Sequence, residues 1–260
     1  MSDPLVLRSV SDRVARIVVN RPDKLNALNR QVLGELRSAV EAAAANADVL
    51  AIVLAGAGAK AFVAGADIGE MAALAPAAAR QFADEGHAIG RAIDRAGKPV
   101  IAAVQGYALG GGCELALMCH LRVAAPAARF GQPEVGLGLI PGFGGTQRLA
   151  RLVGEGRALE MILGGKPVDA ETALAWGLVN RIARERDVVD EAEAWAREIC
   201  GASPAALRLA LAAVRTGLAL PLAEALEFEA AVFGVTFGTE DMREGTAAFL
   251  AKRKPAFPGR

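Results

Sequence analysis

Two glutamates and a run of three glycines in the middle of the chain are the residues best suited to chemistry. The glycines at positions 110–112 follow an apolar strand candidate at residues 99–104 and precede an apolar helical run at residues 113–118. Because glycine has no Cβ, a ligand atom can approach the backbone N–H groups at the start of that helix closely, which suits an oxyanion. Glu114 lies in the first turn of the helical run, and Glu134 follows in a second glycine-spaced apolar segment.

The two glutamates allow two interpretations. If both side chains enter one apolar pocket, their carboxyl groups titrate at different pH values, which provides one acid and one base for proton transfer. Alternatively, Glu114 is a solvated residue favoured by the helix dipole, and Glu134 is a surface residue in a loop that follows Pro133. Residue spacing alone leaves both interpretations open.

Five sequence blocks, spread over most of the chain, give these residues a wider context. They read RPDKLNAL (21–28), KAFVAGADIGEM (60–71), GYALGGGCELAL (106–117), FGQPEVGLGLIPGFGGTQRL (130–149) and EGTAAFLAKRKPAF (244–257). In this order the blocks resemble the enoyl-CoA hydratase/isomerase family, also called the crotonase family. The resemblance implies an α/β fold of the crotonase-like (ClpP/crotonase) type, in which ββα units repeat in a spiral and a C-terminal α-helical subdomain follows.

The resemblance also implies roles for individual residues. Glu114 would act mainly as the base on a water molecule and Glu134 mainly as the acid toward C2, while the N–H groups of Ala66 and Gly111 would form an oxyanion hole. The residues that would border the acyl-CoA are Lys24, Leu25, Ala27, Ala64, Gly65, Ala66, Asp67, Ile68, Tyr107, Leu109, Gly110, Gly111, Pro133, Gly142, Phe249 and Lys252. The implied reaction is reversible addition of water to a trans-2-enoyl-CoA to give a 3-hydroxyacyl-CoA, with no metal and no redox cofactor.

Three alternatives remain beside this reaction. An enoyl-CoA isomerase and a hydratase for branched acyl chains would use the same scaffold, although isomerases of the family generally keep the position of Glu134 and lack Glu114. An RNA-binding relative is less favoured, because 29 basic and 29 acidic residues give zero formal net charge and so no general attraction to nucleic acid.

Composition limits the other classes of protein. At 53% hydrophobic residues the chain has ample material for a core, and no apolar run approaches the length of a membrane span. The N-terminal residues lack the apolar segment of a signal peptide, so a soluble, cytoplasmic protein is expected.

Cys113, Cys119 and Cys200 show no metal-ligand spacing and are expected to be structural thiols. His120, where the family often has an aspartate, is also interpreted as structural.

The pattern of apolar residues predicts the elements that position the site. Strands are expected at 5–10, 14–19, 50–54 and 99–104, an apolar loop around 60–68, and helices at 30–45, 76–97, 144–163 and 170–176. From residue 188 only helices are expected, at 188–200, 204–216, 221–237 and 240–251. We therefore predict a core at residues 1–187 and a helical region at 188–260. The family resemblance implies that this helical region covers the coenzyme A and takes part in a homotrimer or homohexamer.

Overall fold

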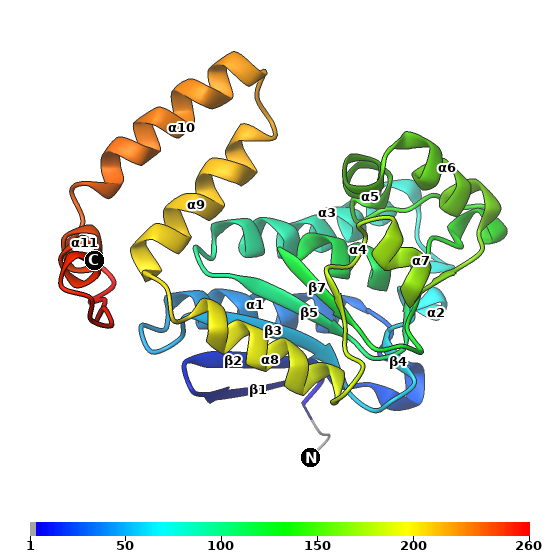
Figure 1. Cartoon of the computed structure of the whole chain (residues 1–260). Helices are drawn as coiled ribbons and strands as arrows, with labels where there is room; N and C mark the ends of the chain where they lie inside the picture. Colours follow the sequence, from blue (N-terminus) through cyan, green and yellow to red (C-terminus); the bar gives the residue numbers. More distant parts are fainter. Residues whose placement is uncertain (1–3) are drawn as a thin grey trace.

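Two β-sheets form the framework of the computed structural model, which describes residues 4–260 (Figure 1). The six-stranded sheet has the order β1-β2-β3-β5-β7-β10, and the four-stranded sheet has the order β4-β6-β8-β9. All pairs except β1/β2 and β8/β9 are parallel. The strands are β1 (Val6–Ser11), β2 (Val14–Val19), β3 (Ala51–Gly56), β4 (Ala61–Val63), β5 (Val100–Val104), β6 (Tyr107–Leu109), β7 (Leu121–Ala124), β8 (Arg129–Gly131), β9 (Val168–Asp169) and β10 (Arg181–Ile182).

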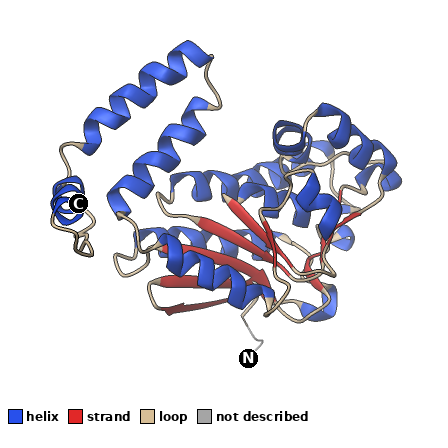
Figure 2. Cartoon of the chain, in the orientation of Figure 1, coloured by secondary structure: helices blue, strands red, loops and turns tan. Residues whose placement is uncertain are grey.

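Helices cover both sheets (Figure 2). They are α1 (Arg30–Ala45), α2 (Ile68–Met71), α3 (Pro76–Arg95), α4 (Gly111–Met118), α5 (Gly145–Val153), α6 (Glu155–Gly164), α7 (Ala170–Ala175), α8 (Val188–Ile199), α9 (Pro204–Gly217), α10 (Leu222–Thr236) and α11 (Glu240–Leu250), with short 3₁₀ turns η1 (Pro22–Lys24) and η2 (Glu134–Leu137). Helix α1 has the bounds predicted for it. It begins at Arg30 because Asn29 caps the first turn, where the Asn29 side chain accepts from the N–H of Val32 at 2.9 Å.

The chain repeats a ββα unit, and this repeat creates the two sheets. Strands β3, β5 and β7 pair in parallel in the larger sheet, whereas the strand that follows each of them, β4, β6 or β8, pairs in the smaller sheet. Helices follow the second strand of each unit. The architecture agrees with the predicted α/β class of repeated ββα units.

The central strand β3 separates two parts of the core. Its side chains alternate, so that Ile52 and Leu54 face the larger cluster, which includes residues of α1, α3 and α4. Ala51 and Val53 face the cluster that contains Val188 and other residues of α8. A parallel strand that is covered on both faces is apolar throughout, and β3 is accordingly a continuous apolar run. Residues of α4 belong to the larger cluster, so α4 is held against one face of the sheet.

Two predictions about secondary structure are wrong in detail. The helix expected at 144–163 is two helices, α5 and α6, because Gly154 between them has φ +87°, which an α-helix does not allow. The apolar loop expected around 60–68 contains strand β4. The other three strands of the smaller sheet were not predicted either, namely β6, β8 and β9. These strands have only two or three residues, too few to show a periodic pattern.

The C-terminal helices differ in their contacts. Helix α8, with which the predicted helical region begins, packs on β3 and β5. Helices α9 and α10 pack on each other and extend beyond the sheets as an arm, and α11 and the C-terminus lie beside the start of α9 (Figure 1). Helix α10 buries no residue within this chain. No helix among residues 4–260 is long and apolar enough to cross a membrane.

Candidate active site

Glu114 is anchored by the backbone of a neighbouring helix. Its side chain is only 2% exposed, in the first turn of α4. Oε1 accepts hydrogen bonds from the N–H of Phe143 at 2.7 Å and from the N–H of Gly145 at 2.6 Å. Because an unpaired buried carboxylate is very costly, these two donors at the start of α5 explain how it can stay in the core. The interpretation of Glu114 as a solvated residue is therefore wrong.

The surroundings of Glu114 hold its carboxyl group close to half-protonated at neutral pH. Burial is the largest cause and raises the pKa of Glu114 to about 7; the hydrogen bond from Gly145 opposes the shift, and the charge of Glu134 adds to it. A pKa near the working pH suits a group that exchanges protons.

Glu134 lies against the glycine turn that precedes α4. A Cβ placed on Gly110 would be 2.8 Å from Oε1 of Glu134, so the carboxylate occupies space that a side chain at position 110 would fill. Gly110 has φ +48°, a conformation that also favours glycine. Partial burial raises the pKa of Glu134 as well. The structure thus brings two carboxyl groups with raised pKa values to the same turn.

Gln132 is a fully buried polar residue beside this pair that sequence reasoning missed. With its amide nitrogen turned toward Glu134, that nitrogen lies 3.1 Å from Oε1 and 3.2 Å from Oε2. The signal available in the sequence was alternation: Phe130 is buried in β8 and Gln132 follows two positions later, where a strand presents the same face.

The backbone of Ala66 comes close to the start of α4. A Cβ placed on Gly111 would lie 3.5 Å from the backbone nitrogen of Ala66. Neither the N–H of Ala66 nor that of Gly111 has an acceptor among residues 4–260. Gly112 lets α4 start against β4, because a Cβ there would be 1.8 Å from the carbonyl oxygen of Val63. Two N–H donors without an acceptor among residues 4–260 therefore lie near each other, next to the turn that Glu134 contacts.

Phe143 connects the site with α3. Its ring packs on Gly86, where a Cβ would lie 2.3 Å from Cδ1 of the ring, and it lies 5.3 Å from the ring of Phe82, centroid to centroid. Since the N–H of Phe143 donates to Glu114, the packing of this ring helps to fix the carboxylate.

Backbone hydrogen bonds join the loop at 21–28 to the segment at 64–68. Both segments contain residues predicted to contact the acyl-CoA. Ala64 donates to the carbonyl of Leu25 at 3.0 Å, and Leu28 donates to that of Gly65 at 2.9 Å. Buried Asn26, not among the predicted residues, donates to the carbonyls of Ala57 and Ala61 and so holds the loop. These segments carry Lys24, Leu25, Ala27, Ala64, Gly65, Asp67 and Ile68.

The remaining predicted contacts fall into two groups. Tyr107 and Leu109 lie in β6, which leads directly into the glycine turn, and Pro133 precedes η2. Gly142 is the residue before Phe143. In contrast, Phe249 in α11 and Lys252 just after it lie beside the arm, away from α4 and α5 (Figure 1), so this chain does not bring them to its own site.

The cysteine next to Glu114 is not poised to react. Cys113 is fully buried, and burial raises the pKa of its thiol, so it stays protonated and a poor nucleophile. His120, at the end of α4, accepts from the N–H of Val100 at Nδ1. Residues 4–260 contain no group of three or more His, Cys, Asp or Glu side chains arranged to hold a metal ion.

Known proteins resemble this chain in sequence and in overall fold. Over 249 residues the chain is 44% identical to the short-chain-enoyl-CoA hydratase of Clostridium acetobutylicum, covering 96% of this chain and 95% of that protein. It is 44% identical to the crotonyl-CoA hydratase of Syntrophomonas wolfei over 252 residues, 97% of each chain. The crystal structure of an enoyl-CoA hydratase subunit from Geobacillus kaustophilus superposes with a TM-score of 0.93 at 44% identity, covering 99% of both chains.

The family assignment extends over nearly the whole chain. An enoyl-CoA hydratase from Bacillus anthracis, 36% identical, also superposes, with a TM-score of 0.94 over 99% of this chain and 100% of that one. Residues 9–260 match the enoyl-CoA hydratase/isomerase family. Together with the shared fold, this match shows that the chain belongs to the enoyl-CoA hydratase/isomerase family.

Proposed function

We propose that this protein is an enoyl-CoA hydratase, which adds water reversibly to a trans-2-enoyl-CoA and gives a 3-hydroxyacyl-CoA. The observation that carries the proposal is the pairing of Glu114 and Glu134, two carboxyl groups with raised pKa values on either side of one glycine turn. The names of the relatives support hydration as the reaction.

In the proposed mechanism the two carboxyl groups hold the reacting water. Ionised Glu114 removes a proton from the water while the oxygen of the water bonds to C3 of the enoyl group. Protonated Glu134 delivers a proton to C2. Oε1 of Glu114 is already occupied by two backbone donors, which leaves Oε2 for the water. Each proton transfer is worth about 10²- to 10⁴-fold in rate, and because the carboxyls interact, the single proton belongs to the pair.

The N–H groups of Ala66 and Gly111 are proposed to hold the thioester oxygen. As water adds, negative charge moves onto this oxygen, and two fixed donors stabilise it best because they need not reorganise. Their lack of any other acceptor among residues 4–260 supports this role. Removal of one such donor costs roughly 3 to 4 kcal/mol in acyl-transfer enzymes.

Crotonyl-CoA is the substrate to test first, because the relatives are named for short-chain and crotonyl thioesters. We expect the purified protein to hydrate crotonyl-CoA, seen as loss of the conjugated thioester absorbance. Incubation with a trans-3-enoyl-CoA separates hydration from isomerisation. Turnover of the 3-enoyl thioester alone, or of neither compound, would contradict the proposal.

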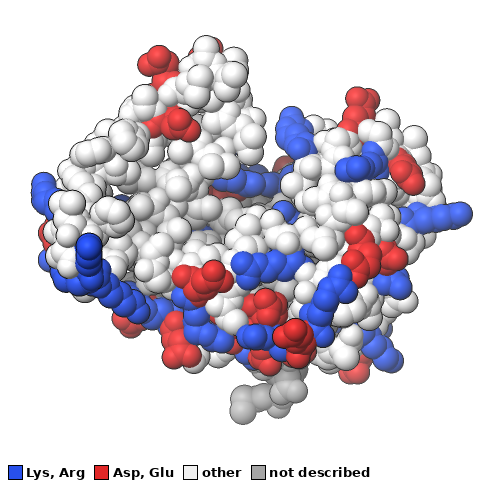
Figure 3. Space-filling model, in the orientation of Figure 1, with Lys and Arg blue, Asp and Glu red and all other residues white. Residues whose placement is uncertain are grey.

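A homotrimer or homohexamer is proposed as the working form. The arm exposes large apolar residues, namely Val214, Leu218, Leu222, Leu226, Phe233 and Val235, and Figure 3 shows few charged side chains on its visible face. A second copy could cover this surface and could bring its Phe249 and Lys252 to the coenzyme A. Light scattering coupled to size-exclusion chromatography measures the mass directly, and a monomer that hydrates crotonyl-CoA at full rate would exclude this arrangement.

A further inference from the structure

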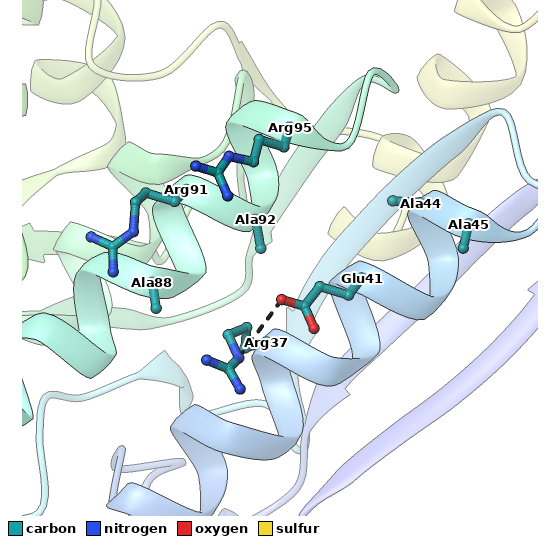
Figure 4. Close-up of a pocket in the computed structure, with 8 residues that line it drawn as sticks. All are labelled: Arg37, Glu41, Ala44, Ala45, Ala88, Arg91, Ala92 and Arg95. Atoms are coloured by element: carbon teal, nitrogen blue, oxygen red, sulfur yellow. Dashed lines mark ion pairs between the residues drawn. The ribbon is translucent and has the colours of Figure 1, made fainter.

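A groove between α1 and α3 combines arginine side chains with a floor of alanines (Figure 4). Its volume is about 380 Å³, within the range of roughly 300 to 1,000 Å³ in which proteins bind small molecules. Helix α1 contributes Arg37, Glu41, Ala44 and Ala45, and α3 contributes Ala88, Arg91, Ala92 and Arg95. None of these residues belongs to the candidate active site.

The charges around the groove do not balance. Three guanidinium groups face one carboxylate, in a chain whose formal net charge is zero. Glu41 pairs with Arg37 on its own helix at 3.7 Å, and Arg91 donates to the backbone carbonyl of Asp84 at 3.3 Å. The side chain of Arg95 lines the groove without an ion pair to any of the residues drawn in Figure 4. The groove therefore contains guanidinium N–H donors that are available to a ligand.

The alanines decide what size of ligand can enter. Ala88 and Ala92 are one helical turn apart on α3, and Ala44 faces them from α1. Longer side chains at these positions would fill the space between the helices. Because the side chains stop at Cβ, the floor is apolar and open while the charges stand at the rim, an arrangement that admits a small ligand with anionic groups.

We propose that this groove binds a small phosphate-bearing anion. The planar guanidinium group presents paired N–H donors that match phosphate oxygens, and it stays charged at every physiological pH. Arg91 and Arg95 line the groove from α3 and Arg37 lines it from α1, so a multiply charged anion bound there has guanidinium groups on both helices. The inference is independent of the acyl-CoA chemistry, because the two sites share no residue.

Inorganic pyrophosphate is the probe for this site. Isothermal titration of the full chain at low ionic strength should show saturable binding, which persists when the active site is filled with acetoacetyl-CoA. The double variant Arg91→Gln/Arg95→Gln should weaken binding at least about tenfold, since hydrogen bonds between charged groups are the strong ones. Ala92→Glu, which places a carboxylate in the groove, should weaken it at least as much.

Arg80→Gln is the matched control, because Arg80 is exposed on the same helix and lies outside the groove. It should bind pyrophosphate within about twofold of the wild type. Circular dichroism and crotonyl-CoA hydration verify that every variant is folded. The proposal is overturned if the wild type does not bind, if acetoacetyl-CoA displaces the pyrophosphate, or if Arg91→Gln/Arg95→Gln binds as tightly as Arg80→Gln.

Discussion

The N–H of Gly145 donates a 2.6 Å hydrogen bond to Oε1 of Glu114 and so ties the start of α5 to the first turn of α4. A Cβ at position 145 would lie 2.9 Å from the same oxygen. Glycine at this position is what lets the backbone approach the carboxylate. The geometry of Glu114 is therefore set by an element 31 residues further along the chain.

Replacement of Gly145 tests this relationship. Gly145→Ala should lower kcat for crotonyl-CoA hydration by about 10- to 100-fold, because the new Cβ displaces Glu114 and a small misplacement of a catalytic group is costly. Gly156→Ala is the control, since a Cβ at position 156 of α6 meets nothing within 4 Å. Equal rates for the two variants would show that this contact does not position the base.

Loss of either carboxyl group should abolish most activity. Glu114→Gln and Glu134→Gln keep the shape of the side chain but cannot exchange a proton, so we expect kcat to fall by about 10²- to 10⁴-fold. KM for crotonyl-CoA should change little, and circular dichroism should show that both variants are folded. Near wild-type hydration by either variant would remove that residue from the mechanism.

The rate of hydration should depend on pH through the raised pKa of Glu114. Because burial raises this pKa to about 7 and the base must be ionised, kcat/KM for crotonyl-CoA should rise with pH along a limb centred near pH 7. This midpoint belongs to the coupled pair rather than to one residue. A limb centred near 4.5, the ordinary value for Glu, would mean that the carboxyl group that acts as base is solvated.

The raised pKa of Glu114 should also make the free energy of unfolding depend on pH. Between about pH 4.5 and 7 the folded protein retains a proton on Glu114 that the unfolded chain has released, so the free energy of unfolding falls as pH rises through this window. Relative to Glu114→Gln, the wild type should lose roughly 3 kcal/mol across the window and no more above it.

Chemical denaturation at a series of pH values measures this difference. Glu160→Gln, a change at an exposed position of α6, serves as the control and should follow the wild type. A constant difference between wild type and Glu114→Gln from pH 4.5 to 8 would contradict the raised pKa.

The packing of Phe143 on α3 gives a prediction about stability. Gly86→Ala places a Cβ 2.3 Å from the ring of Phe143, and overpacking of this kind costs about 1 to 3 kcal/mol. The ring must move, so hydration should slow as well. Gly34→Ala in α1, where a Cβ meets nothing within 4 Å, should be no less stable than the wild type by urea denaturation.

The amino-acid sequence predicted most of the long helices and the strands β1, β2, β3 and β5 of the larger sheet. Val32, Leu33, Leu36 and Val40 recur at helical spacing and are all buried in α1. Local signals of this kind suffice because a helix of 16 residues repeats its pattern over several turns. The motif around Glu114 and Glu134 also indicated the family by itself.

Other features depended on the tertiary structure. The three-residue strands β4, β6 and β8 form only because each pairs in parallel with its neighbour from another ββα unit. Gly154 breaks the predicted helix, and an isolated glycine in a helical pattern does not reveal by itself whether it adopts a positive φ.

The surroundings of the two carboxyl groups were also decided by the fold. Sequence placed Glu114 at a helix start and Glu134 in a loop, and residue spacing left open whether their side chains are solvated or share a pocket. Only the packing of α5 against α4 buries Glu114 and supplies its two N–H donors, and only the turn at Gly110 receives Glu134. Burial and distance arise from contacts between elements far apart in the chain, and for that reason the raised pKa values could not be read from residue order.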